Sequence, residues 1–410
     1  MPTSRRSQAA ATIRRHRRRR RPLKADSRTT CRSSLADGSI PVCFSKPEAM
    51  NNSSHPFGSI NVSKIILPIV IGLGVVAWLF WREFDPKTFD NMIFTWKAVV
   101  FLLLAFILMF SRDFGYMIRI RVLSDNRLTW RQAFRIIMLW EFTSSVTPSA
   151  IGGTSVAILF VNKEGISLGK SSSIVLATSF LDELYFIVMF PILLLTVNIN
   201  RLFTIGDHSG FINEFFWFAI IGYSIKLVYT IIVSYGLFIN PRGLKWLLLQ
   251  IFRLPFLKRW KHQINEAGYE IIVSSNELRR KPFMFWVKAF GSTAFSWTSR
   301  YWVANMIILA FFFLPKFGDH FLIFARQFVM WIMQLIAPTP GGSGFAEGIF
   351  TRYLGDVIPV NDLELAGSLA VVLALVWRLI SYYPYLIVGA FIVPKWIKNK
   401  FADKTKATTP

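Results

Sequence analysis

The sequence has 410 residues, of which 53% are hydrophobic and only 17% are charged, with a formal net charge of +24. A soluble globular chain has about a quarter charged residues, whereas here apolar runs of about 20 residues recur from Ile65 to Val393. This pattern excludes a soluble multidomain protein and a secreted domain behind one signal peptide. We predict an all-α polytopic membrane protein whose basic residues lie mostly in loops, where they report orientation rather than nucleic-acid binding.

Residues 1–49 form an Arg-rich segment of a different character. They contain the run Arg17–Arg21 and a Ser/Thr-rich stretch without apolar periodicity, which predicts disorder. Three interpretations stay open: a polybasic arm on the anionic inner leaflet, an organelle transit peptide, or a mis-called start upstream of a physiological start at Met50.

Six continuous apolar stretches are long enough to span a bilayer, which takes roughly 17–25 residues. They are Ile65–Trp81, Met92–Phe110, Ser171–Thr196, Phe215–Phe238, Phe283–Phe312 and Ala366–Val393. Two further apolar stretches are interrupted near their middle by Pro and Gly. Phe134–Val161 is broken at residues 147–153, and Phe321–Phe350 is broken at residues 338–344.

The positive charges orient these stretches. The segment Arg112–Arg131, the loop Asn240–Pro282 and the tail after Lys395 are basic and are predicted to be cytoplasmic, together with both termini. This assignment requires each broken stretch to leave the membrane on the side from which it enters, the first from the cytoplasm and the second from outside. We therefore predict six full spans and two re-entrant Pro/Gly-broken hairpins. Two ordinary Pro-kinked spanning helices are the alternative.

Each half then follows the order span, span, hairpin, span, and the halves start on opposite sides. This is an inverted repeat, in which substrates bind where broken helices meet. The predicted first membrane repeat covers residues 50–196 and the second covers 197–395, with a basic cytoplasmic loop at 240–282. A cytoplasmic tail covers 396–410. Apolar and basic residues interleave from Leu244 to Trp260, which predicts contact with the anionic inner leaflet.

The two breaks and the helices that follow them contain four motifs. They are Thr147-Pro148-Ser149-Ala150-Ile151-Gly152-Gly153, then Asp182-Glu183, then Pro338-Thr339-Pro340-Gly341-Gly342-Ser343-Gly344-Phe345-Ala346-Glu347, then Arg378-Leu379-Ile380-Ser381-Tyr382-Tyr383. Together these motifs resemble a known family, the flippase-like transmembrane region of the lysylphosphatidylglycerol synthetases. The resemblance extends from about Ile65 to Lys395 and implies a lipid-handling membrane protein. Full-length synthetases also carry a soluble aminoacyl-transfer domain after this region, so we expect no lysyl transfer by this chain alone.

One departure from the family concerns the first break. Many members carry an Arg or an acidic residue just after the first Gly-Gly, where this chain has Thr154-Ser155-Val156-Ala157. The identity of the lipid head group therefore stays open.

Ionisable residues inside spans are costly and mark candidate sites. We expect Arg378 to bind a lipid phosphate, and Asp182 or Glu183 to bind an ammonium group or carry a proton; a purely structural ion pair among them is the alternative. Glycine amides at the second break suit a phosphate, or the glycines permit close packing. The predicted substrate-binding residues are Pro148, Gly152, Gly153, Asp182, Glu183, Pro340, Gly341, Gly342, Gly344, Glu347 and Arg378. Secondary candidates are Glu141, Arg326, Arg300 and Tyr382.

These features predict a translocator of a lipid or lipid-linked intermediate in the cell (inner) membrane. It would move a phosphate-containing head group through a cavity between the repeats. The sequence contains no catalytic triad, Walker loop, dinucleotide fingerprint or metal-ligand spacing, so we expect no cofactor, no metal and no enzymatic activity. The alternatives are a membrane-embedded transferase or accessory subunit acting on a polyprenyl-phosphate or phospholipid, with Asp182 or Glu183 as its base, and a partner-binding scaffold.

Overall fold

The computed structural model describes residues 29–30, 44–45, 95–147, 150–203, 211–251, 269, 272–273, 275–314, 316–334, 339, 341–360 and 363–401. The chain divides into two compact units, residues 1–60 and 61–410. In the first unit β1 (Thr29–Thr30) pairs with β2 (Phe44–Ser45) in antiparallel orientation. The predicted span Ile65–Trp81 lies outside the described residues.

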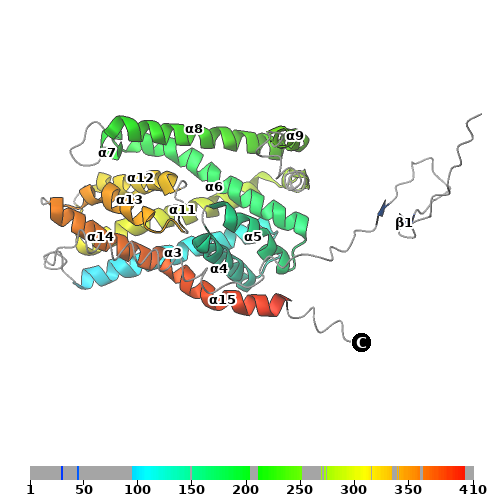
Figure 1. Ribbon diagram of the computed structural model, residues 1–410, viewed down its shortest axis with the longest axis horizontal. Coiled ribbons are helices and arrows are strands. Elements are labelled where there is room, and N and C mark those ends of the chain that lie inside the picture. The colour runs from blue at the N-terminus through cyan, green and yellow to red at the C-terminus, as the bar shows by residue number, and fades with distance from the viewer. Residues whose placement is uncertain are drawn as a thin grey trace, which may run out of the picture. The chain divides into compact units, whose positions relative to one another are not determined.

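The described part of the second unit is a bundle of helices (Figure 1). Among the described residues, four segments are long and apolar enough to cross a membrane: α3, α6, residues 216–238 of α8, and the combined segment Leu365–Lys400. These segments indicate a multi-pass membrane protein, and the count of six spans stays a prediction. The helices are α3 (Trp96–Leu123), α4 (Trp130–Val146), α5 (Ala150–Lys163), α6 (Leu168–Thr196), α7 (Ile199–Phe203), α8 (Phe211–Phe238), α9 (Pro241–Ile251), α11 (Phe283–Phe311), α12 (Phe317–Gln334), α13 (Phe345–Leu354), α14 (Leu363–Ser381) and α15 (Tyr383–Phe401).

One predicted boundary is wrong. Helix α3 continues to Leu123, so the first part of the predicted cytoplasmic segment Arg112–Arg131 is helical. Arg112 and Arg119 lie on this extension and are only 1% and 5% exposed. They are buried inside the bundle, where they cannot act as loop charges that set orientation.

The predicted last span, Ala366–Val393, falls within the apolar segment Leu365–Lys400, which is long enough to cross a membrane. A break at the single residue Tyr382 divides this segment into α14 and α15. Pro384 accounts for the break, because it has no N–H to donate to the carbonyl of Ile380. Tyr382 at this break is buried inside the bundle, with 6% of its surface exposed.

Both Pro/Gly-broken stretches consist of two helices that pack against each other, α4 with α5 and α12 with α13. In the first pair, the end of α5 lies beside the start of α4. Gln132 on the first turn of α4 donates from Nε2 to the carbonyl oxygen of Glu164, which follows α5, at 3.1 Å, and Arg135 reaches the Glu164 carboxylate at 2.9 Å. In the second pair, Arg326 of α12 donates to the carbonyl oxygen of Tyr353 near the end of α13 at 2.9 Å. Each broken stretch is therefore a helical hairpin, and its re-entrant course in a membrane stays a prediction.

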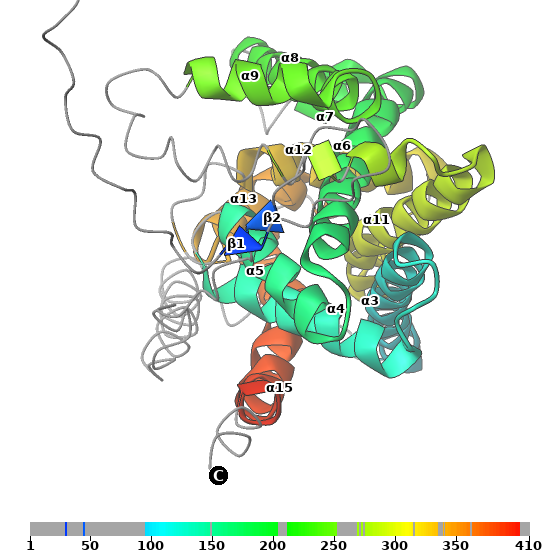
Figure 2. The same ribbon diagram turned by 90° about the vertical axis from the view of Figure 1, so that its right-hand side faces the viewer.

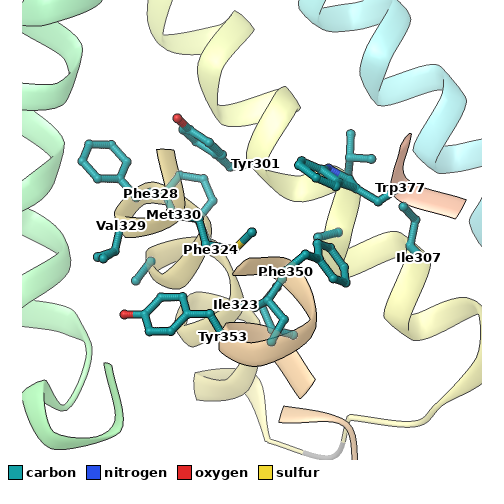
Figure 3. Packing of buried hydrophobic residues seen from close by; sticks show 14 of the residues in the cluster. Tyr301, Ile307, Ile323, Phe324, Phe328, Val329, Met330, Phe350, Tyr353 and Trp377 are labelled. Atoms are coloured by element: carbon teal, nitrogen blue, oxygen red, sulfur yellow. The ribbon is translucent and has the colours of Figure 1, made fainter. Parts of the chain in front are cut away.

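Aromatic side chains fill the core between the second hairpin and its neighbours. Phe324 and Phe328 of α12, Tyr301 of α11, and Phe350 of α13 pack together with Trp377 of α14 (Figure 3). The Phe350 and Trp377 rings stack with centroids 5.3 Å apart. This packing fixes α12, α13 and α14 relative to one another, and thereby positions the break between α12 and α13.

Helices α3 and α11 form the most extensive helix pair of the bundle and lie side by side (Figure 2). Small residues make this approach possible. At Gly115 of α3, an added Cβ would lie 2.3 Å from Oγ of Ser296 and 3.0 Å from the carbonyl oxygen of Ser292, both on α11. The two helices are therefore in backbone contact at a position that accepts no side chain.

We predict that Gly115→Leu lowers the thermal stability of the detergent-purified protein. Overpacking typically costs about 1–3 kcal/mol, because the α3 and α11 backbones must separate. Gly291→Leu is the matched control on α11, since an added Cβ there meets nothing within 4 Å. Equal melting temperatures for the two variants would contradict the close packing of α3 on α11.

Candidate functional site

A cavity of about 320 Å³ lies where the two hairpins end. The last turns of α4 and α12 reach it, through Ser144 and Ser145 on α4 and through Trp331 and Gln334 on α12. Its volume falls within the range of about 300–1,000 Å³ that is typical of ligand pockets. The charged residues that line it are Arg112, Arg119, Glu141, Asp182, Glu183, Arg300 and Arg378.

Tyr382 joins the two hairpins at this cavity. Its hydroxyl donates to the carbonyl oxygen of Ser145 in the first hairpin at 3.1 Å, and it accepts from Oγ of Ser343 in the second at 3.4 Å. Its ring also lies against Gly341, where an added Cβ would approach within 2.4 Å. Gly341 has a φ of 58°, a left-handed conformation that favours glycine. The glycine at this position therefore allows both the turn and the approach of Tyr382.

Arg378 is held by groups of the second hairpin. Its Nε lies 2.8 Å from Oε1 of Glu347, and its guanidinium donates to the carbonyl oxygens of Gly341 and Gly342 at 3.2–3.3 Å. The second carboxylate oxygen of Glu347 accepts from the Gly344 amide at 2.7 Å, which caps α13. We expected glycine amides to bind phosphate here, but these groups are already engaged. The carbonyls of Gly341 and Gly342 face Arg378, and the amide of Gly344 donates to Glu347. A substrate role for Arg378 stays a prediction.

Asp182 and Glu183 are both paired with cations from other helices. Asp182 accepts from Arg119 of α3 at 2.5 Å and from the indole of Trp297 on α11 at 2.7 Å. Glu183 lies 2.5 Å from Nζ of Lys226 on α8. The sequence analysis gave an ion pair between Arg378 and Asp182 or Glu183 as the alternative to a substrate role, and the structure does not form that pair, since Arg378 binds Glu347. These pairs instead tie α6 to α3 and to α8.

A third cluster lies on α3 and α4. Arg112 contacts Glu141 at 2.5 Å and its neighbour Asp113 at 3.0 Å. Asp113 also accepts from the hydroxyl of Tyr385 on α15 at 2.8 Å. Because Arg112 is almost fully buried, it needs both carboxylates to compensate for its lost hydration.

Arg300 differs from the other guanidinium groups of the cavity. It lies on α11, is partly buried, and forms no ion pair with any residue that the structure describes. Its guanidinium carbon lies 5.5 Å from the centroid of the Trp297 ring. Arg300 therefore faces the cavity with hydrogen-bond donors that are free to bind an anion.

Seven predicted residues line one cavity although they come from four helices and two turns of the chain. Of the others, Glu347 and Gly342 hold Arg378, the Gly344 amide donates to Glu347, and Gly153 packs against Ser144. Gly152 lies in α5, and Pro148 and Pro340 fall outside the described residues. The seven are Glu141, Asp182, Glu183, Arg300, Gly341, Arg378 and Tyr382.

Arg326 is a predicted secondary residue that does not line this cavity. Its guanidinium instead binds the carboxylate of Asp356 and the carbonyl oxygens of Tyr353 and Arg201. It joins α12 to the end of α13 and to α7, which indicates a structural role.

The sequence analysis missed Arg112, Tyr116 and Arg119. They are spaced by four and three residues, so they share one face of α3. Continuing the helical period beyond Phe110 would have found them. The tryptophans of the lining, among them Trp140 and Trp297, had no such signal, because apolar spans are rich in aromatic residues.

The sequence matches the family model described as lysylphosphatidylglycerol synthase TM region over residues 65–389. The chain belongs to this family. A relative described as a UPF0104 membrane protein of Archaeoglobus fulgidus is 27% identical over 360 residues, which cover 82% of this chain and 98% of the relative. Both broken stretches and the charged cavity lie within the matched lysylphosphatidylglycerol synthase TM region, and membership fits a lipid-related role in the membrane.

We predict that Arg378→Gln and Glu347→Gln each destabilise the protein by about 3–5 kcal/mol, because each leaves a buried charge without its partner. The double variant should lose less than the sum of the two. Melting temperatures in detergent measure this, with Arg352→Gln, an exposed residue of α13, as the control. Additive losses would contradict a direct pair between Arg378 and Glu347.

Proposed function

We propose that this protein is a flippase-like translocator of a lipid or lipid-linked intermediate, and that the phosphate of the head group binds at Arg300 in the cavity. The observation that carries the proposal is the imbalance of pairing within the cavity. The other three lining guanidinium groups have carboxylate partners, and Arg300 has none among the described residues. A planar guanidinium with free donors suits a bidentate phosphate contact.

The position of the cavity supports transport. It lies between the tips of two hairpins, the arrangement that transporters with broken helices use for substrate sites near the bilayer midplane. In our proposal both hairpins are re-entrant, one from each side of the membrane, and the two halves form an inverted repeat. Non-helical backbone at that depth requires protein or a polar cavity around it, and the charged lining satisfies that requirement.

A membrane-embedded transferase is the second candidate. It would need a carboxylate free to act as a base, such as Asp182 or Glu183. In the structure Asp182 accepts two hydrogen bonds and Glu183 pairs with Lys226. Both carboxylates are thus engaged in ion pairs and hydrogen bonds with neighbouring helices, which favours the translocator.

The test is lipid movement in vesicles that contain the purified protein. The probes are fluorescent short-chain phosphatidylglycerol, phosphatidylethanolamine and a polyprenyl phosphate, and an impermeant quencher reports which leaflet they occupy. We expect the wild type to accelerate exchange of at least one probe. Arg300→Gln should slow it roughly tenfold or more, because a hydrogen bond to a charged group contributes about 1.5–3 kcal/mol.

Arg300→Lys should restore part of the rate, since it keeps the charge but loses the planar fork. The matched control is Arg352→Gln, which removes an exposed guanidinium outside the cavity. Unchanged movement in Arg300→Gln would contradict the assigned role. Chemical modification of the same lipids in detergent, where no leaflets exist, would favour the transferase.

A further inference from the structure

A second hollow, of about 680 Å³, opens between α3 and α15. It shares no lining residue with the charged cavity. Helix α4 forms its floor, since α4 packs against both neighbours and lies between them in Figure 2. We call it the α3–α15 groove. None of the residues that line it, all in the described part of the chain, is acidic.

One wall of the groove is apolar. Phe110, Phe114 and Met117 follow one another on α3 at spacings of four and three residues, so they form a single stripe about 10 Å long. Phe134 on α4 and Ile392 on α15 continue this surface across the floor and the opposite wall. The stripe has the length and chemistry to contact part of an acyl chain.

Two tryptophans mark one end of the groove. Trp130, the first residue of α4, stacks on Phe114 with ring centroids 5.5 Å apart. Trp396 of α15 donates from its indole nitrogen to Glu164 at 3.1 Å. Tryptophan is enriched at the level of lipid head groups, so we expect this end of the groove to lie at the membrane interface.

Four cations line the groove at this same end, and only two of them are compensated. Arg135 and Lys400 both pair with Glu164, at 2.9 and 3.3 Å. Arg131 on α4 and Lys395 on α15 are exposed and form no ion pair with any described residue. These two free charges come from the floor and the opposite wall of one groove.

We propose that the α3–α15 groove binds one anionic phospholipid of the surrounding leaflet. Its acyl chain lies along the stripe of α3, its glycerol region lies beside Trp130 and Trp396, and its phosphate lies between Arg131 and Lys395. The order apolar, aromatic, cationic along the groove matches the order of groups along such a lipid. Two uncompensated cations without a lining carboxylate favour an anionic over a zwitterionic head group. This site does not depend on the proposed translocation.

The test is photo-crosslinking in vesicles of phosphatidylcholine that contain a minor share of phosphatidylglycerol. The full chain carries p-benzoylphenylalanine in place of Phe114, or in place of Phe106 as the control. Phe106 is also on α3 and 50% exposed, but it does not line the groove. Mass spectrometry of the cross-linked lipid gives the share of phosphatidylglycerol at each position.

At position 114 we expect phosphatidylglycerol to be enriched roughly tenfold over its share of the bilayer, the order expected from two cations near a lipid phosphate. At position 106 its share should equal that of the bilayer. Adding Arg131→Gln with Lys395→Gln should remove the enrichment. Arg242→Gln with Lys398→Gln, which removes one exposed Arg and one exposed Lys outside the groove, should leave it intact.

Three results would overturn the proposal. They are equal shares at positions 114 and 106, an enrichment that persists without Arg131 and Lys395, and cross-linking of position 114 to a second copy of the chain instead of lipid.

Discussion

The pairing of buried charges is the constraint on which this structure depends. A charge removed from water inside a membrane bundle must find a partner. Here the partners lie on different elements: Arg119 of α3 binds Asp182 of α6, Lys226 of α8 binds Glu183 of α6, and Arg378 of α14 binds Glu347 of α13. These pairs hold together helices that hydrophobic contacts alone do not orient, since lipid competes equally well for apolar surface.

The same pairs explain how a polar cavity persists at the centre of an apolar bundle. Each carboxylate offsets a guanidinium or an ammonium group, and Tyr382 connects the two hairpin tips by hydrogen bonds. Arg300 lies among these satisfied groups without a carboxylate of its own. In our account this arrangement gives the cavity one anion-binding position that is ready before a ligand arrives, while the surrounding charges keep the walls in place.

The sequence predicted the helices and the residue types of the site. It did not predict the contacts between distant segments. Runs of apolar residues located the helices, and the Pro/Gly breaks located both hairpins. Intramembrane charges marked Asp182, Glu183 and Arg378, which do line one cavity. Their partners could not be predicted, because nothing local to Glu183 indicates Lys226, which lies 43 residues away. The burial of Arg112 was missed for a related reason: an arginine after an apolar run resembles a loop charge until the helix around it is known.

The central claim is that the two hairpins enter the membrane from opposite sides and meet at the charged cavity. Single cysteines at four exposed positions test it most directly, in a chain with Cys31→Ser and Cys43→Ser and with an impermeant thiol reagent applied to either side. Arg127→Cys before α4 and Ser167→Cys after α5 should label from one side of the membrane. Lys316→Cys before α12 and Arg352→Cys in the last turn of α13 should label from the other. Labelling of Arg127→Cys and Ser167→Cys from opposite sides would contradict the account.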